Sequence, residues 1–198
     1  MAPRKGRPTQ SWATFLRNHA HAIAAIDMFT VRALGFKRLY GFVALGLGRR
    51  VVLRTDVADH PTALWLARQI TEAFPWDTAP EFLVRDNDGA YGLVFWRRVR
   101  AMGIRDRPTM PRSPWQNGYV ERLVGSIRRD CLDHMIILDE AHLRRVLAAY
   151  ADYYNNDRTH LALGKDAPLS RAVEARGKLV SRPVLGGLHR RYGRKPPE

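Results

Sequence analysis

The chain has 198 residues, 45% of them apolar, which is enough for one folded domain with a core and too many for a disordered chain. No apolar run approaches the ~20 residues that cross a bilayer. Residues 1–10 are polar and lack the apolar stretch of a secretory signal. Cys131 is the only cysteine, so an intramolecular disulfide and a cysteine-rich zinc site are excluded, and we expect a reducing, cytoplasmic setting.

The net charge is +14 at pH 7 and the pI is near 10.8. A charge of this size predicts a polyanionic partner, because cations that neutralise phosphates release condensed counterions. It also fits a well-solvated surface or a codon bias toward arginine, but nucleic acid is the favoured interpretation. The cations are concentrated after Ser170, where Glu174 and Glu198 are the only acids; they are Arg171, Arg176, Lys178, Arg182, Arg190, Arg191, Arg194 and Lys195.

The first part of the chain predicts a lead-in followed by three strands. Residues 1–18 are expected to form a flexible basic lead-in. Residues 21–31 are almost continuously apolar, which is typical of a strand covered on both faces. Two more strands are expected at 36–47 and 49–57, with a hairpin turn at Gly46-Leu47-Gly48. Three strands in series with short connections predict an antiparallel meander.

From residue 59 onward the pattern alternates between helical and strand periods. Asp59-His60-Pro61 is typical of a helix start, and Ser113 with Gln116 fits a capping box before a long helix. The expected elements are a helix at 62–74, a strand at 81–85, a helix at 92–102, a strand at 103–107, and helices at 113–134 and 139–154. This order predicts an α/β fold, a mixed five-stranded sheet with helices on both faces.

Three acidic residues are candidates for a site, although each has an ordinary explanation. Asp27 lies inside an apolar strand, where a carboxylate is costly unless it is paired or metal-bound, but it also fits an Asp that caps a turn. Asp86 ends a strand but belongs to Asp-Asn-Asp-Gly, a strong turn sequence. Glu121 lies near the start of the long helix, where an acid complements the helix dipole. None of the three indicates a site by itself.

The long helix adds a polar stripe beside an apolar one. The apolar stripe consists of Val120, Leu123, Val124, Ile127 and Cys131, and the neighbouring stripe of Asn117, Glu121, Gly125 and Arg128. Three carboxylates from two strands and a helix would suit hard divalent cations such as Mg²⁺. A pair of such ions can activate an attacking oxygen and stabilise a leaving one in phosphoryl transfer.

Several segments, in the same order along the chain, resemble DDE transposases and retroviral-type integrases. Ile26-Asp27-Met-Phe-Thr-Val31 and Asp86-Asn-Asp-Gly-Ala-Tyr91 resemble the two Asp segments of that family. Pro114-Trp-Gln-Asn117-Gly118-Tyr-Val-Glu121 resembles its Pro-x-x-Asn-Gly-x-x-Glu run, and Arg128 fills the place of a basic residue seven positions later. Tyr154-Asn155-Asn-Asp-Arg158-Thr-His160 is similar to its Tyr-Asn-x-x-Arg-Pro-His tail, with Thr159 in place of the usual Pro. The resemblance covers about residues 8–165.

The resemblance implies a ribonuclease-H-like fold, a Mg²⁺ or Mn²⁺ cofactor, and a catalytic, metal-binding triad of Asp27, Asp86 and Glu121. It further implies that Asn117 and Arg128 bind DNA through phosphate contacts. The residues of the tail segment are expected to brace the last helix rather than touch DNA; they are Tyr154, Arg158 and His160.

The spacing of the second and third acids departs from the family. Between Asp86 and Glu121 lie 34 residues, one fewer than usual. Asp88 is therefore a competing choice for the second Asp. Counting from Asp88 shortens the gap further and puts Tyr91 at the wrong offset, so Asp86 is the preferred assignment.

The resulting hypothesis divides the chain into a lead-in at 1–18, a catalytic core at 19–165 and a basic tail at 166–198. It predicts an enzyme, nucleoid-associated in the cytoplasm, that cuts and joins DNA at mobile-element ends and targets. A homo-oligomer is expected by analogy with related enzymes. A separate helix-turn-helix chain is a further possible partner, because the residues before Asp27 are too few to form a helix-turn-helix domain. Two alternatives stay open: an inactive, basic DNA-binding remnant, and a nuclease of the same fold acting on RNA–DNA hybrids.

Overall fold

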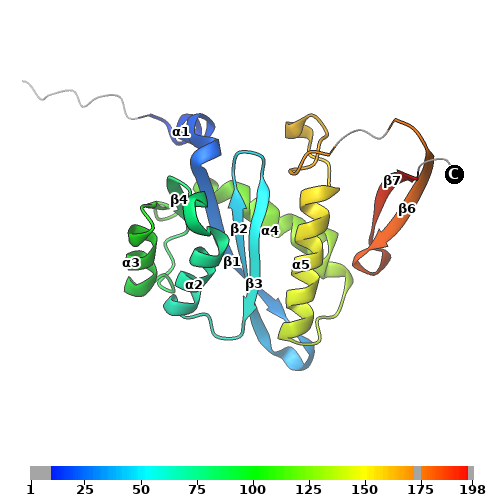
Figure 1. Cartoon of the computed structure of the whole chain (residues 1–198). Helices are drawn as coiled ribbons and strands as arrows, with labels where there is room; N and C mark the ends of the chain where they lie inside the picture. Colours follow the sequence, from blue (N-terminus) through cyan, green and yellow to red (C-terminus); the bar gives the residue numbers. More distant parts are fainter. Residues whose placement is uncertain (1–9, 172–174, 196–198) are drawn as a thin grey trace, which may run out of the picture.

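The computed structural model describes residues 10–171 and 175–195 (Figure 1). Within this part of the chain, five strands form one mixed sheet in the order β3-β2-β1-β4-β5. The strands are β1 (Ile23–Arg32), β2 (Arg38–Gly46), β3 (Val51–Ala58), β4 (Phe82–Arg85) and β5 (Arg105–Pro108). Strands β1 to β3 are antiparallel neighbours, whereas β4 and β5 run parallel to β1. The predicted meander and mixed five-stranded sheet are confirmed.

The helices cover both faces of the sheet, as predicted. Helices α2 (Ala63–Ala73) and α3 (Leu93–Ala101) pack on one face over a core that includes Ile26, Phe42 and Leu83. Helices α1 (Trp12–His19), α4 (Gly118–Asp130) and α5 (Glu140–Asn156) contribute to the core on the other face. Figure 1 shows α2 and α3 on one side of the strands and α5 on the other.

Two glycines of the meander lie where a side chain would crowd a neighbouring residue. A Cβ on Gly41 of β2 would lie 2.6 Å from the ring of Phe29, its register partner on β1. A Cβ on Gly48 would lie 3.3 Å from the Cα of His21. The turn after β2 instead places Arg50 at a positive φ of 62°. The predicted hairpin is therefore present, but its glycine serves packing rather than the left-handed backbone.

The expectation that residues 1–18 form a flexible lead-in is wrong for the part that the structure describes. Ser11 caps α1 by accepting from the Thr14 N–H, and the helix is held by its aromatic side chains. The Trp12 indole N–H donates to the Gln116 carbonyl at 3.1 Å, and the Phe15 ring packs edge-on against Phe82. Apolar burial, invisible in the lead-in's local composition, orders this segment. Residues 1–9 lie outside the described part.

The predicted capping box at Ser113 is also wrong. Residues Pro114–Asn117 form a 3-10 turn, and α4 begins only at Gly118. The Ser113 side chain makes no capping hydrogen bond, and the Gln116 side chain accepts from the Met110 N–H at 2.7 Å instead. The loop before α4 is therefore braced by Gln116 rather than begun as helix by Ser113.

The basic tail contains an antiparallel hairpin of β6 (Lys178–Val184) and β7 (His189–Lys195). The hairpin lies beside α5, away from the five-stranded sheet (Figure 1). The His189 ring stacks on Tyr153 at 4.3 Å, and Arg191 pairs with Asp152 and Asp157. Glu174 and Glu198, noted in the tail, lie outside the described residues. No helix in the described ranges is long and apolar enough to cross a membrane.

Candidate active site

Asp27 lies in the middle of β1 on the face that α4 covers. Its neighbours Ile26 and Met28 pack with the α2–α3 core, whereas Ala25 and Phe29 pack with the opposite core, so alternation puts Asp27 on the second face. The side chain is half-buried and accepts from the Met28 N–H at 2.8 Å. Burial, followed by the negative charges of Asp86 and Glu121, raises the pKa of Asp27 to about 7, against the lowering effect of the Met28 hydrogen bond.

Asp86 follows directly after β4, the parallel neighbour of β1. The register pairs Ala25 with Val84, and the same offset continued by two residues sets Asp86 level with Asp27. Asp86 is half-buried, and its pKa is raised by burial and by the charge of Asp88, against the lowering effect of Arg85. The parallel pairing of β1 and β4 thus brings two acids, 59 residues apart in the sequence, to the place where β4 ends beside β1.

Glu121 comes from the first turn of α4 and is exposed. Its pKa is raised by burial and by the charge of Asp86. Electrostatic repulsion therefore links Asp27, Asp86 and Glu121 to one another. None of the three forms an ion pair with any residue in the described ranges.

The donor set fits a hard divalent cation in its chemistry. The structure supplies carboxylate oxygens that repel one another, and cation binding would relieve this repulsion. The Asn117 Oδ1, a buried oxygen on the neighbouring turn, has no hydrogen-bond partner. As the side chains stand, however, no three His, Cys, Asp or Glu residues among those described are grouped closely enough to hold a metal ion.

Asp88, the competing second acid, has a different environment. It is exposed, and its Oδ1 accepts from the Ala90 N–H at 2.7 Å, which is the turn geometry expected of Asp-Asn-Asp-Gly. Its charge acts on Asp86, whereas Asp27 and Glu121 are shifted by Asp86. This pattern favours Asp86 over Asp88.

Asn117 and Arg128 both contact β1 in the structure. The buried Asn117 side chain donates its Nδ2 to the Ile26 carbonyl at 3.1 Å, next to Asp27. The Arg128 guanidinium lies over the Phe29 ring and donates to the Thr30 carbonyl at 3.0 Å. Both side chains thus hold α4 against the strand that carries Asp27, while their contacts to DNA remain a prediction.

Arg85 and Tyr91, close to Asp86 in the sequence, have surroundings that the sequence pattern did not reveal. The Tyr91 hydroxyl is buried without a hydrogen-bond partner, and burial and the charges of Asp86 and Asp27 raise its pKa well above the ordinary value. Arg85 is buried over the Tyr91 ring and forms a two-bonded pair with Asp106 of β5. The available signal was an arginine inside an otherwise apolar strand.

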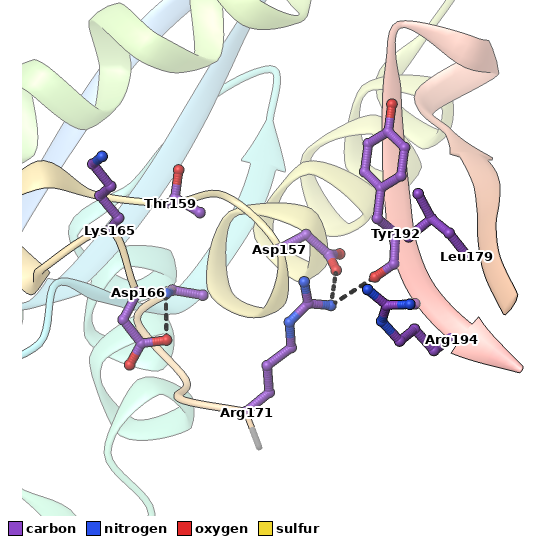
Figure 2. A pocket seen from close by; sticks show the side chains of 10 residues that line it. Asp157, Thr159, Lys165, Asp166, Arg171, Leu179, Tyr192 and Arg194 are labelled. Atoms are coloured by element: carbon purple, nitrogen blue, oxygen red, sulfur yellow. Dashed lines mark hydrogen bonds and ion pairs between the residues drawn. The ribbon is translucent and has the colours of Figure 1, made fainter. Parts of the chain in front are cut away.

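The predicted bracing of the last helix is present. Arg158 donates to Asp130 at the end of α4, and the His160 ring packs edge-on against Tyr154. Beyond α5, a hollow of about 320 Å³ separates this segment from the hairpin (Figure 2). Its walls include Lys165, Arg171 and Tyr192, and the Arg171 guanidinium bridges Asp157 and the Tyr192 carbonyl. This hollow is built from residues other than the three acids.

Comparison with known proteins agrees with the fold and the motifs. Residues 102–168 match the integrase core domain family. A 31.7 kDa protein of insertion element IS407 from Burkholderia multivorans is 31% identical over 154 residues, covering 78% of this chain and 49% of the relative. Transposase InsD of insertion element IS2D from Escherichia coli is 32% identical over 92 residues, covering 46% of this chain and 31% of the relative. The chain thus spans about half or less of the length of these relatives.

Solved structures share the fold at low sequence identity. The magnesium complex of the HTLV-2 integrase catalytic core has a TM-score of 0.56 at 15% identity, with 75% of this chain and 93% of that chain covered. The catalytic domain of Mos1 mariner transposase has a TM-score of 0.58 at 11% identity, with coverages of 76% and 84%. The chain therefore shares the ribonuclease-H-like fold of these integrase and transposase catalytic cores, and its residues 102–168 match the integrase core domain family.

Proposed function

We propose that this core cuts and joins DNA strands by phosphoryl transfer, with Asp27, Asp86 and Glu121 as its catalytic, cation-binding carboxylates. The proposal rests on the placement of Asp27 in β1, of Asp86 directly after the parallel neighbour β4, and of Glu121 in the first turn of α4. None of the three has an ion-pair partner among the described residues, and the charge of Asp86 repels the charges of Asp27 and Glu121. Such unrelieved repulsion is unfavourable for stability, and functional sites are where it is commonly retained. The family supplies the reaction type, and the +14 charge fits a DNA substrate.

In this proposal each element has a distinct task. Strand β1 carries Asp27, and Asp86 directly follows β4, the parallel neighbour of β1, so the sheet positions both carboxylates. Helix α4 adds Glu121, and its position is fixed by the bonds of Asn117 and Arg128 to β1. Bound Mg²⁺ or Mn²⁺ would stabilise the charge that develops on the attacking and leaving oxygens of the phosphodiester.

The partners of the whole protein belong to the same proposal. DNA ends of a mobile element and a target duplex are the expected substrates. The dimeric and trimeric forms described for the HTLV-2 core make a homo-oligomer the expected working state by analogy. Recognition of specific ends is assigned to a separate helix-turn-helix chain or domain.

The test is a nicking and strand-transfer assay on labelled duplex DNA with Mg²⁺, using Asp27→Asn, Asp86→Asn and Glu121→Gln. Each variant is expected to lose about a thousand-fold in rate, the scale of removing a group that stabilises transition-state charge. Asp88→Asn is the matched control and is expected to stay within a few-fold of the unmodified chain.

Each contrary outcome identifies another hypothesis. An inactive Asp88→Asn with an active Asp86→Asn would move the second acid to position 88. Cleavage of the RNA strand of a hybrid, with duplex DNA left intact, would indicate a ribonuclease. Mg²⁺-independent DNA binding without cleavage by any form of the chain would indicate a DNA-binding remnant.

A further inference from the structure

Arg85 and Asp106 form a buried ion pair next to Asp86, and the proposed chemistry gives this pair no task. Arg85 is the last residue of β4, a strand whose other three residues are apolar. Its guanidinium donates from Nε and Nη2 to the two carboxylate oxygens of Asp106 on β5, at 3.0 and 2.7 Å. A buried pair of charges needs a reason, because well-packed apolar residues of similar volume stabilise a fold at least as well.

The third nitrogen of Arg85 contacts the backbone of the next residue. Its Nη1 donates to the Asp86 carbonyl oxygen at 3.0 Å. The pairing of β4 with β1 and β5 ends no later than Arg85, so this bond holds a peptide that the sheet itself does not hold. The same guanidinium lies over the Tyr91 ring, 4.8 Å from its centroid. Arg85 thus contacts both ends of the segment 86–91.

We propose that Arg85 is a positioning residue for Asp86 and that Asp106 holds Arg85 in place. This role rests on the proposed function, in which Asp86 binds a cation. A pair that served the fold alone would need only the two bonds between β4 and β5. The bond from Nη1 to Asp86 goes further, because one planar, rigid guanidinium then fixes the start of the segment relative to β5. Groups that orient the ligands of a metal ion in this way commonly determine its affinity.

Asp106 also accounts for a guanidinium so near a proposed cation site. An unpaired arginine would repel a divalent cation, whereas the two-bonded pair carries no net charge. The pair therefore supplies a hydrogen bond and a rigid contact to the segment that contains Asp86, with little opposition to cation binding.

The experiment measures binding of Mn²⁺ to the whole chain without DNA, by the electron paramagnetic resonance signal of the free ion, beside the melting temperature without Mn²⁺. Arg85→Met/Asp106→Leu replaces the pair with apolar side chains, so the melting temperature should be kept or raised. The dissociation constant for Mn²⁺ should nevertheless rise at least about ten-fold, the scale for groups that orient metal ligands. Arg85→Lys, which keeps the charge and loses the planar fork, should weaken Mn²⁺ binding in the same direction.

Two further variants serve as references. Asp86→Asn removes the proposed cation ligand and should bind Mn²⁺ at least as weakly as the double variant. Val146→Ala is the control for stability, because Val146 is buried in α5, which packs on β3 at the opposite edge of the sheet from β5. It should lower the melting temperature and leave the affinity for Mn²⁺ within two-fold.

Two results would overturn the positioning role alone. Unchanged Mn²⁺ affinity in both Arg85 variants would show that the pair serves only the fold. Equal weakening by Val146→Ala would show that affinity follows stability rather than the placement of Asp86. In either case the proposed function stands if Asp86→Asn loses Mn²⁺ binding. An unmodified chain that binds no Mn²⁺ would instead overturn the proposed cation site, and the role of Arg85 with it.

Discussion

The acids at the candidate active site and the acids beneath the C-terminal hairpin are held in opposite ways. Asp157, whose side chain is 5% exposed, accepts from Arg191 at 2.6 Å and also pairs with Arg171. Asp27, half-buried in β1, has no cation partner among the described residues and is repelled by Asp86 and Glu121. The same residue type is thus neutralised in one region and left with its charge unbalanced in the other.

This difference separates structural acids from candidate functional ones. A buried carboxylate with an arginine partner fixes two elements together, here α5 and the hairpin. A buried carboxylate facing other carboxylates weakens the fold unless a cation binds. Substitutions that change the charge balance in either region test this distinction.

The largest effect is expected from Asp27→Asn, which should lower the rate of DNA cleavage and raise the melting temperature. The rate of DNA cleavage should fall by about a thousand-fold because a catalytic carboxylate is lost. The melting temperature in the absence of divalent cations should rise, because the amide carries no charge to be repelled by Asp86 and Glu121. Calorimetry beside the cleavage assay checks both parts. A melting temperature that falls would show that the Asp27 charge is structural.

Next in size is the loss of the buried pair between Arg85 and Asp106. Their side chains are 8% and 11% exposed and joined by two hydrogen bonds. Asp106→Ala leaves the guanidinium buried without its partner and should lower the free energy of unfolding by about 3–5 kcal/mol in denaturant titrations. Glu81→Ala is the control, since its pair with Arg105 is exposed and should contribute less than about 1 kcal/mol. Equal losses in the two variants would contradict the distinction.

A smaller, local effect is expected from Asp157→Ala under the hairpin. The substitution removes the shared partner of Arg191 and Arg171 and should cost about 2 kcal/mol, felt mainly by the hairpin. Hydrogen exchange should show faster exchange in β6 and β7 with unchanged protection in β1 and β2. Protection lost equally across the sheet would mean that hairpin and core unfold as one unit.

The sequence predicted the sheet well because its signals are local and repeated. Apolar runs and turn residues specify β1 to β4, and the order of elements then leaves few topologies. Asp27 and Asp86 could be singled out only through motif resemblance, because their ordinary turn explanations were stronger than any spacing argument. Their proximity depends on the pairing of β1 with β4, which no single segment encodes.

What the sequence could not predict depends on contacts between distant segments. Helix α1 is ordered by Trp12 and Phe15 reaching Gln116 and Phe82, which lie far away in the chain. The hairpin depends on Arg191 meeting acids on α5, which a tail full of cations does not reveal. Contacts between distant residues determine the positions of α1 and of the hairpin, whereas the composition of a segment gives information about that segment alone.

The pH dependence of stability sharpens the comparison at Asp27. Its pKa rises from 3.8 to about 7 on folding, so the folded chain holds a proton that the unfolded chain releases. This contribution to the free energy of unfolding is present below about pH 4 and is lost as pH rises toward 7. Thermal melts across this window should therefore show a decline that Asp27→Asn flattens. Identical slopes in the two proteins would contradict the raised pKa.

The smallest effect is expected on the outer face of the hairpin, where Arg190 donates to the Ser181 hydroxyl and has no ion-pair partner among the described residues. Alternation along β7 turns His189 and Arg191 toward α5 and exposes Arg190 and Tyr192. Cations that interleave with an aromatic ring suit a nucleic-acid strand, through phosphate contacts and base stacking.

Arg190→Ala/Tyr192→Ala should weaken binding of labelled DNA by a few-fold and reduce its salt dependence, since one phosphate contact is lost. Arg145→Ala on α5 removes the same charge elsewhere and should change binding less. Equal losses in the two proteins would mean that the hairpin adds only to the overall charge. A larger loss in the double variant than in Arg145→Ala would mean that Arg190 and Tyr192 contact DNA. The pair of Arg191 with Asp157 would then hold the hairpin in the position that presents these two side chains.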